Sequence, residues 1–414
     1  MSSEVPDSTP SGPRPLDRVA LSVLAAFVAL TPAAARAQPL PSFTDADILE
    51  EPSYFRLRSF GARYTHYEQT GTGYQSREGP RRGPGSQQAT IEQPQIEAVI
   101  EQGDDIVHRF WLPVDVVTAA SPDAVDVVST ASRTNEAGAL DWTLTHGENT
   151  TTPLSVSGGF HAEENYRSYS FGLAGVLSLA EDNTVLSANG AQILDWFDNY
   201  KFSGKHDGHV PRSATHAGAG VSQVLSPTTI AYLDYGITYQ QGQLSNTWNT
   251  VPWLGRRPGQ TGYLPDTRMI EVLPPRRTRH AAVLRVAQWL PWSGALKLGY
   301  RFYADDWDIQ AHSAEIELDQ RLHPYLYIGA TYRFHTQTSA RFFTKGLHDP
   351  PPLRTADSDL DAFDAHTVGA KAALDLPVSL DFASRVHVDI AFERYARTND
   401  LEVMVYTCEL AFSR

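Results

Sequence analysis

Cysteine and methionine are nearly missing from this sequence, which has one cysteine, Cys408, and 3 methionines among 414 residues. A single cysteine excludes an intramolecular disulfide framework and any metal site built from cysteines. The fold must therefore be stabilised by hydrogen bonds and packing rather than by covalent cross-links.

Positive charge and long apolar runs are also scarce. Lysine and arginine number 34 against 48 aspartates and glutamates, so the formal net charge is −14. This balance offers no broad basic face to phosphates and argues against a nucleic-acid partner. No segment has the roughly 18 consecutive apolar residues that a membrane-spanning helix needs, so the sequence predicts no transmembrane helix.

The first 37 residues have the parts of a secretory signal peptide: a basic start, a short apolar segment and a small-residue cleavage motif. Arg14 and Arg18 precede the apolar segment 19–30 (VALSVLAAFVAL), and the motif ARA follows at 35–37. As a helix the apolar segment spans about 18 Å, which is too short for a bilayer core of ~30 Å. We predict a signal peptide over 1–37 and a short periplasmic segment over 38–54, with an N-terminal anchor as the alternative.

The remaining chain alternates between apolar and polar residues, which is typical of β-strands with two different faces. In the segment 295–303 (ALKLGYRFY), leucine and aromatic residues occupy the even positions and Lys297 and Arg301 lie between them. The segments 325–335 and 386–393 repeat this pattern. A helix would scatter these residues around its circumference, whereas a strand sorts them onto two faces.

The pattern predicts sixteen strands, with fourteen as the fallback, at 55–68, 90–101, 106–118, 139–147, 153–163, 166–180, 184–198, 215–225, 229–240, 281–290, 295–304, 309–321, 325–336, 366–376, 383–395 and 401–413. Connections after even-numbered strands are all short, and the long ones, such as 241–280 and 337–365, follow odd-numbered strands. This asymmetry predicts an all-β fold, a transmembrane antiparallel up-and-down β-barrel over 55–414, in the bacterial outer membrane. A secreted β-sandwich or jelly roll is the alternative.

Several segments resemble an uncharacterised family of bacterial outer-membrane proteins, a domain of unknown function of about 400 residues. The resembling segments include AASPDAVDVVSTAS at 119–132, VSQVLSPTTIAYLDYG at 221–236, YRFYADDWDIQAHSAEI at 300–316 and DSDLDAFDAHTVGAK at 357–371. The resemblance implies a barrel fold and an outer-membrane location, and it implies no activity.

Charged residues on the polar faces of the strands are candidates for the wall of a lumen: Arg301, Arg333, Glu315, Glu317, Asp389 and Glu393. They could set the field in a water-filled channel, or they could form salt bridges that hold the barrel together. Arg276, Arg277 and Arg279 are predicted at the end of the longest loop, as a candidate anion-facing segment. They could meet lipopolysaccharide phosphates, line a pore, or pair with nearby carboxylates.

Two acidic clusters, 305–308 and 357–364, contain the carboxylates that Ca²⁺ prefers, but neither matches the EF-hand pattern. No G-x-S-x-G or H-E-x-x-H motif occurs, and the dipeptides at 161–163 and 206–207 are too short to define a site. The sequence thus predicts no catalytic residues, no metal and no cofactor.

The leading functional hypothesis is porin-like or export-related passage of small solutes. A structural or assembly component that binds partners through its long loops is the alternative, and a barrel-borne hydrolase is a weaker third. Expected partners are outer-membrane lipid, lipopolysaccharide and the barrel-assembly machinery.

Overall fold

A computed structural model describes residues 54–71, 89–117, 135–163, 166–200, 205–245, 250–252, 268–345 and 351–414. The predicted signal peptide and, apart from Tyr54, the predicted periplasmic segment lie outside these ranges. Among the described residues, no helix combines the length and apolar character required to cross a membrane.

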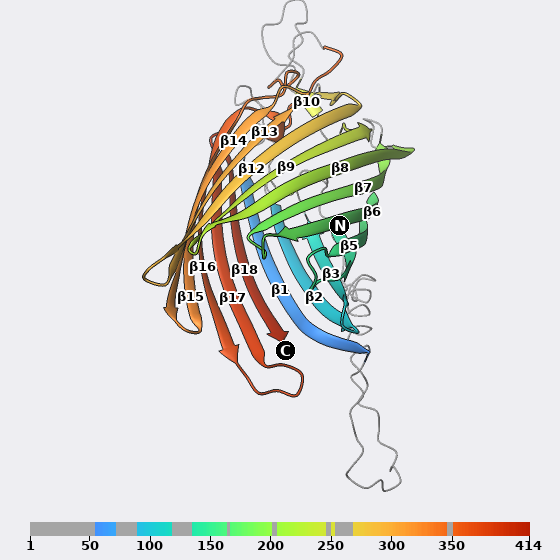
Figure 1. Cartoon of the computed structure of the whole chain (residues 1–414). Coiled ribbons are helices and arrows are strands. Elements are labelled where there is room, and N and C mark those ends of the chain that lie inside the picture. Colours follow the sequence, from blue (N-terminus) through green and yellow to red (C-terminus); the bar gives the residue numbers. More distant parts are fainter. Residues whose placement is uncertain are drawn as a thin grey trace, which may run out of the picture. The chain divides into compact units, whose positions relative to one another are not determined.

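In these ranges sixteen antiparallel strands form one closed barrel, which confirms the predicted fold class and strand number (Figure 1). The strands are β1 (Phe55–Gly71), β2 (Ala89–Gln102), β3 (Ile106–Val117), β4 (Asn135–His146), β5 (Leu154–Glu163), β6 (Tyr166–Leu179), β7 (Thr184–Tyr200), β8 (His206–Ser226), β9 (Thr229–Gly242), β12 (Arg276–Leu290), β13 (Gly294–Asp305), β14 (Gln310–His323), β15 (Leu326–Gln337), β16 (Phe363–Pro377), β17 (Arg385–Arg397) and β18 (Leu401–Ser413). Between β9 and β12, β10 (Thr250–Pro252) and β11 (Arg268–Ile270) form a separate two-stranded sheet. A 3₁₀ helix, η1 (Ser358–Leu360), precedes β16.

The barrel is closed by pairing of the first strand with the last. Residues 59–71 of β1 pair with 401–413 of β18, from Ser59 opposite Ser413 to Gly71 opposite Leu401. The two strands, blue and red, lie side by side in Figure 1. Because every strand has a partner on both sides, backbone donors and acceptors along the wall are paired within the protein.

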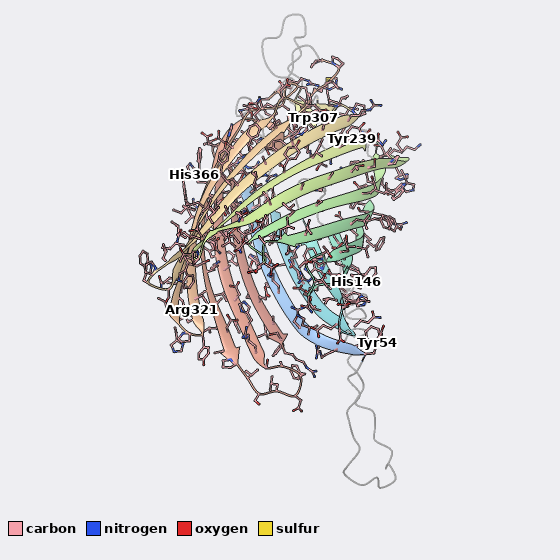
Figure 2. The ribbon with its side chains drawn as sticks, viewed as in Figure 1. Tyr54, His146, Tyr239, Trp307, Arg321 and His366 are labelled. Carbon is pink, nitrogen blue, oxygen red and sulfur yellow. The ribbon has the colours of Figure 1, made fainter. Side chains whose placement is uncertain are left out.

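The two ends of the barrel differ in the length of their connections. At one end, called here the turn end, neighbouring strands are joined by short segments such as 103–105, 227–228 and 291–293. At the other, the loop end, the segments 243–275 and 338–362 make the longest connections. Figure 2 shows Tyr54, His146 and Arg321 toward the turn end, and Tyr239 and Trp307 at the loop end. The predicted alternation of short and long connections is confirmed.

Several strands extend further toward the loop end than the sequence predicts, and three differ most. β8 begins at His206 rather than 215, β12 at Arg276 rather than 281, and β4 at Asn135 rather than 139. These additional residues are mostly polar, and they extend the paired wall beyond its apolar part. A hydrophobic pattern marks only the apolar part of a strand, whereas backbone pairing continues without it.

Candidate lumen wall and loop cap

The two faces of the wall have opposite chemistry. On β13 to β15, Leu298, Ile316, Leu318, Ile328 and Tyr332 alternate with inward residues and are 41–48% exposed on the outer face. Charged side chains lie on the concave inner face, where residues from strands two apart reach one another. The side-chain alternation predicted for 295–303, 325–335 and 386–393 is the one observed.

The predicted lumen residues Arg301, Glu315, Glu317, Arg333, Asp389 and Glu393 all fall on this inner face, each between outward-facing neighbours. Arg333 Nε donates to Glu315 Oε2 at 2.7 Å, which joins β15 to β14. Both side chains are about one-third exposed, so the pair contributes under about 1 kcal/mol to stability. Its main consequence is a fixed pattern of charge on the wall.

Glu317 lies in a larger network that sequence analysis missed. Lys297 Nζ on β13 lies 3.1 Å from Glu317 Oε1 and 2.7 Å from Asp319 Oδ2. Lys371 Nζ on β16 lies 2.6 Å from the same glutamate oxygen and 2.9 Å from Asp319 Oδ1. We call these four residues the charge ladder. It links β13, β14 and β16 on the lumen side of β15.

The ladder can cross β15 because Gly329 has no side chain. Gly329 lies opposite Asp319 on one neighbouring strand and opposite Lys371 on the other. A Cβ at this position would lie 2.5 Å from Asp319 Oδ1 and 2.5 Å from Lys371 Cε. The glycine therefore leaves the gap through which the lysine reaches the acidic pair.

Among the described residues of the inner rim at the loop end, three of the buried arginines each lie beside a carboxylate and an aromatic ring. Arg277 Nε donates to Asp305 Oδ2 at 2.9 Å, and the guanidinium lies 4.3 Å from the Trp307 ring centroid. Tyr303 donates its hydroxyl to the same carboxylate at 2.9 Å. The Asp305 side chain has no exposed surface, so its negative charge depends on these partners.

The same combination recurs at two other places on the rim. Arg212 Nε donates to Asp195 Oδ2 at 2.8 Å beside Phe197. Arg397 Nη1 donates to Asp359 Oδ1 at 2.6 Å, with its guanidinium 4.3 Å from the Phe363 ring centroid. Each cluster ties neighbouring segments together where the wall meets the loops.

One loop segment packs against this rim and forms a small core of its own. We call residues 338–345 and 351–362, with Trp307 and Ile309, the loop cap. Its core contains Trp307, Ile309, Ala340, Phe342 and Leu360, and the inward side chain of Tyr303 packs against it.

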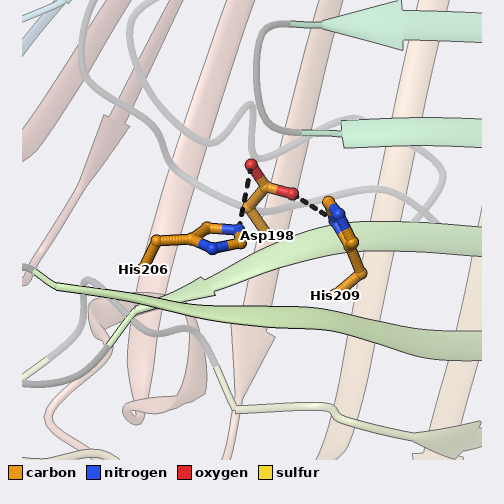
Figure 3. A group of neighbouring side chains, drawn as sticks. All are labelled: Asp198, His206 and His209. Atoms are coloured by element: carbon orange, nitrogen blue, oxygen red, sulfur yellow. Dashed lines mark ion pairs between the residues drawn. The ribbon is translucent and has the colours of Figure 1, made fainter.

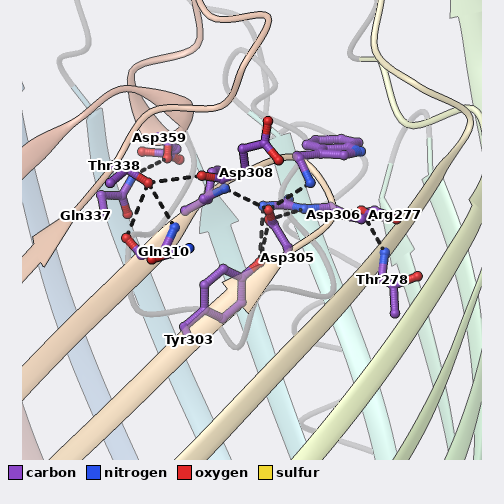
Figure 4. Close-up of polar contacts among 12 residues, drawn as sticks. Arg277, Thr278, Tyr303, Asp305, Asp306, Asp308, Gln310, Gln337, Thr338 and Asp359 are labelled. Carbon is purple, nitrogen blue, oxygen red and sulfur yellow. Dashed lines mark hydrogen bonds and ion pairs between the residues drawn. The ribbon is translucent and has the colours of Figure 1, made fainter.

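Hydrogen bonds also fasten the cap to inward-facing residues of the wall (Figure 4). The Gln337 amide donates to the carbonyls of Asp359 and Asp361 at 2.9 and 2.7 Å. Within the cap, Arg341 donates its backbone N–H to the Trp307 carbonyl at 3.0 Å. Since Gln337 and Tyr303 both face inward, the cap lies on the lumen side of the wall.

Acidic residues within the cap stabilise its turns. Asp357 accepts a hydrogen bond from the Asp359 N–H at 3.0 Å and so caps η1. Burial, together with the negative charges of Asp359 and Glu271, raises the pKa of Asp357 to about 8. In the other acidic cluster, Asp305 accepts from the N–H groups of Trp307 and Ile309, both at 3.0 Å. Asp305 and Asp357, one carboxylate from each acidic cluster, are thus engaged in local structure.

The three predicted loop arginines lie in a strand, which corrects the sequence prediction. Arg276, Arg277 and Arg279 belong to the start of β12, where they pair with residues 238–241 of β9. Arg276 is exposed, while Arg277 and Arg279 are buried at 6% and 9%. The polar run RRTRH hid the strand because its inward arginines find partners at the rim instead of forming an apolar face.

These features define the class of protein to which the chain belongs. It is a closed antiparallel β-barrel with an apolar outer face, a charged lumen and a capped loop end. Residues 200–410 match the sequence profile of a family described as "Protein of unknown function (DUF3570)". The chain belongs to this family, and the predicted resemblance is confirmed. A comparison with curated proteins gives no match.

Several solved structures are similar to this chain at low sequence identity. A mutant of the ferric enterobactin receptor PfeA of Pseudomonas aeruginosa is 11% identical with a TM-score of 0.40, over 81% of this chain and 53% of that chain. The present chain thus spans about half the length of that receptor. A bacterial polysaccharide outer-membrane secretin is 8% identical (TM-score 0.45, 85% and 98% covered). OccK2 (OpdF) of P. aeruginosa, in complex with glucuronate, is 10% identical (TM-score 0.42, 87% and 96% covered).

Proposed function

We propose that this chain is a bacterial outer-membrane barrel that passes small hydrophilic solutes through its lumen. The observation that carries the proposal is the sorting of side chains across one closed wall, apolar outside and charged inside. Lipid requires an apolar outer surface and full backbone pairing, and a water-filled interior accommodates the charge ladder. Sixteen strands enclose enough space for an aqueous passage where loops do not fill it.

Aromatic residues on the outer face support the membrane location. Tyr300 on β13 and Tyr332 on β15 point their hydroxyls to His312 and His366 on the next strand, with O–N distances of 2.6 and 2.8 Å. Tyr235 makes the same contact with His280 at 2.7 Å. In all three pairs the histidine lies toward the loop end. Tyrosines with an apolar ring and a hydrogen-bonded polar tip are typical of a membrane–water interface.

The loop cap is the part of the structure most suited to restrict passage. It is attached to inward-facing residues at one end of the lumen, through the Gln337 hydrogen bonds and the clusters of Arg277 and Arg397. A solute entering from the loop end would meet the cap first and the charge ladder afterwards. In this order the cap would select solutes by size, and the charge ladder would select them by charge.

Two experiments test the proposal. Outer-membrane fractions from an expressing bacterium should contain the protein, and its band in SDS-PAGE should migrate differently after boiling, because a closed barrel resists SDS until heated. The purified protein should then give discrete ion conductances in planar bilayers. A soluble periplasmic band without heat-modifiability would contradict the membrane location. A heat-modifiable barrel without conductance that co-purifies with a stoichiometric partner would instead support a structural or assembly role.

A further inference from the structure

At the loop end, the β7–β8 hairpin brings together two histidines and one aspartate from its two strands (Figure 3). Asp198 lies on β7, and His206 and His209 lie on β8. One possible ligand atom from each residue, a carboxylate oxygen or a ring nitrogen, lies within 4.8 Å of the other two. Asp198 Oδ1 is 2.5 Å from His209 Nδ1, and its Oδ2 is 3.6 Å from His206 Nε2.

The backbone places these groups together. Asp198 and His209 are directly opposite in the β7–β8 register, and a bulge follows between Asp198 and Tyr200. Gly208, between the two histidines, has φ +85°, a conformation that residues with side chains rarely adopt. This turn at the glycine brings the His206 ring next to the His209 ring, with the ring centroids 5.4 Å apart.

The side chains have the exposure that a binding site requires. His206 is 46% exposed, His209 is 69% exposed and Asp198 is 22% exposed. The carboxylate is therefore held in place while both imidazoles can be reached from solvent. None of the three takes part in the charge ladder, the rim clusters or the loop cap.

We propose that Asp198, His206 and His209 bind a divalent transition-metal ion of the zinc class. Two imidazoles and one carboxylate are a common set of protein ligands for Zn²⁺, with water at the remaining position. Tetrahedral ligands about 2.0–2.1 Å from zinc lie roughly 3.3 Å from one another. The two imidazole nitrogens lie 2.5 and 3.6 Å from different oxygens of the same carboxylate, which is close to that spacing. Imidazole selects against Ca²⁺ and Mg²⁺, which prefer oxygen ligands. The bound ion would tie β7 to β8, and this inference is independent of whether the lumen conducts.

The test is a calorimetric titration of the purified full chain in detergent with Zn²⁺ at about pH 7.5, since metal ligation requires neutral imidazole. We expect one Zn²⁺ per chain, and excess Ca²⁺ should not displace it. The double variant His206→Ala/His209→Ala should lose at least about tenfold in affinity. Gly208→Ala keeps all three ligands but strains the turn, so it should weaken binding as well.

The matched control is His146→Ala/His323→Ala, which removes two exposed imidazoles from the turn end. It should bind Zn²⁺ like the wild type. Heat-modifiability of each variant shows that the barrel has formed, so a loss of binding cannot be attributed to misfolding. Absence of Zn²⁺ binding by the wild type, equal binding by the His206/His209 double variant, or loss in the control would each overturn the proposal. Affinity should also be lower in acid, because protonated imidazole cannot ligate a metal.

Discussion

Lys371 of β16 and Asp319 of β14 meet across the backbone of Gly329 on the strand between them, with Lys371 Nζ 2.9 Å from Asp319 Oδ1. This contact skips a strand, and it depends on a residue that has no side chain. It shows how the lumen wall fixes charges by register as well as by residue type.

Gly329→Ala should disturb this contact. The added methyl group would lie 2.5 Å from Asp319 Oδ1, so both charged side chains would have to move. We expect the free energy of unfolding to decrease by about 1 kcal/mol. This value is at the low end for overpacking because flexible side chains can adjust. Gly138→Ala is the control, since a Cβ there meets nothing within 4 Å. Urea unfolding of the refolded barrel in detergent measures the stability of both variants. Equal stability of the two variants would contradict this role of Gly329.

Removing the ladder lysines should change ion selectivity. In Lys297→Gln/Lys371→Gln the wall keeps the charges of Glu317 and Asp319, so cations should be favoured by roughly a factor of two or more over the wild type. Glu317→Gln/Asp319→Asn should shift selectivity toward anions. Reversal potentials in a salt gradient give the permeability ratios. Arg394→Gln, which removes a positive charge from the outer face, serves as the control, and a shift of similar size there would count against a lumenal role for the ladder.

The loop cap should weaken as the pH rises. In the unfolded chain an aspartate has a pKa of about 4, whereas the folded cap raises the pKa of Asp357 to about 8. The folded cap therefore holds a proton that the unfolded segment releases, and its stability decreases between about pH 4 and pH 8. Above pH 8 the ionised Asp357 repels Asp359 and Glu271. Hydrogen exchange of residues 351–362, corrected for intrinsic rates, should show faster opening at about pH 9 than at pH 6.

Asp357→Asn is the matched variant for this pH dependence. Its side-chain oxygen can still accept from the Asp359 N–H, but it cannot ionise. Hydrogen exchange of the cap in this variant, corrected for intrinsic rates, should not change between about pH 6 and pH 9. An unchanged pH dependence in Asp357→Asn would assign the effect to another group.

Arg277→Ala should loosen the rim. The substitution leaves the buried carboxylate of Asp305 without its ion-pair partner, a change that costs about 3–5 kcal/mol at buried sites. It also removes the cation beneath the Trp307 ring, so the cap core should open. The neighbouring, exposed Arg276 provides the control, and Arg276→Ala should stay within about 0.5 kcal/mol of the wild type. Urea unfolding and limited proteolysis of the cap distinguish the two, and comparable behaviour would exclude the proposed anchoring role of Arg277.

The sequence predicted the apolar part of the wall and missed its polar extensions. Leu298 and Ile316 mark their strands because lipid selects apolar residues at alternate positions. The segment 206–214 (HDGHVPRSA) and the run RRTRH at 276–280 lack that mark, although both pair with neighbouring strands. Beyond the apolar band no alternation is imposed on the outer face, so composition alone suggests a loop.

The candidate site was predictable only in part. Alternation predicted that Glu317 and Arg333 face inward, but it could not predict the partners of Lys371, which depend on register across three strands. The metal-site candidates were visible only as the dipeptide His206–Asp207. Asp198 joins them through pairing across the hairpin and through a bulge that a single sequence does not reveal. Gly208 between two histidines was the available signal.

Passage of solutes through a water-filled lumen can be tested by cysteine accessibility during bilayer recordings. In a Cys408→Ser background, Thr331→Cys places a thiol on the inner face of β15, and Ala330→Cys places one on the outer face. A charged, water-soluble thiol reagent should reduce the current through Thr331→Cys and leave Ala330→Cys unchanged. No current at all, or equal sensitivity of the two variants, would contradict passage through the barrel.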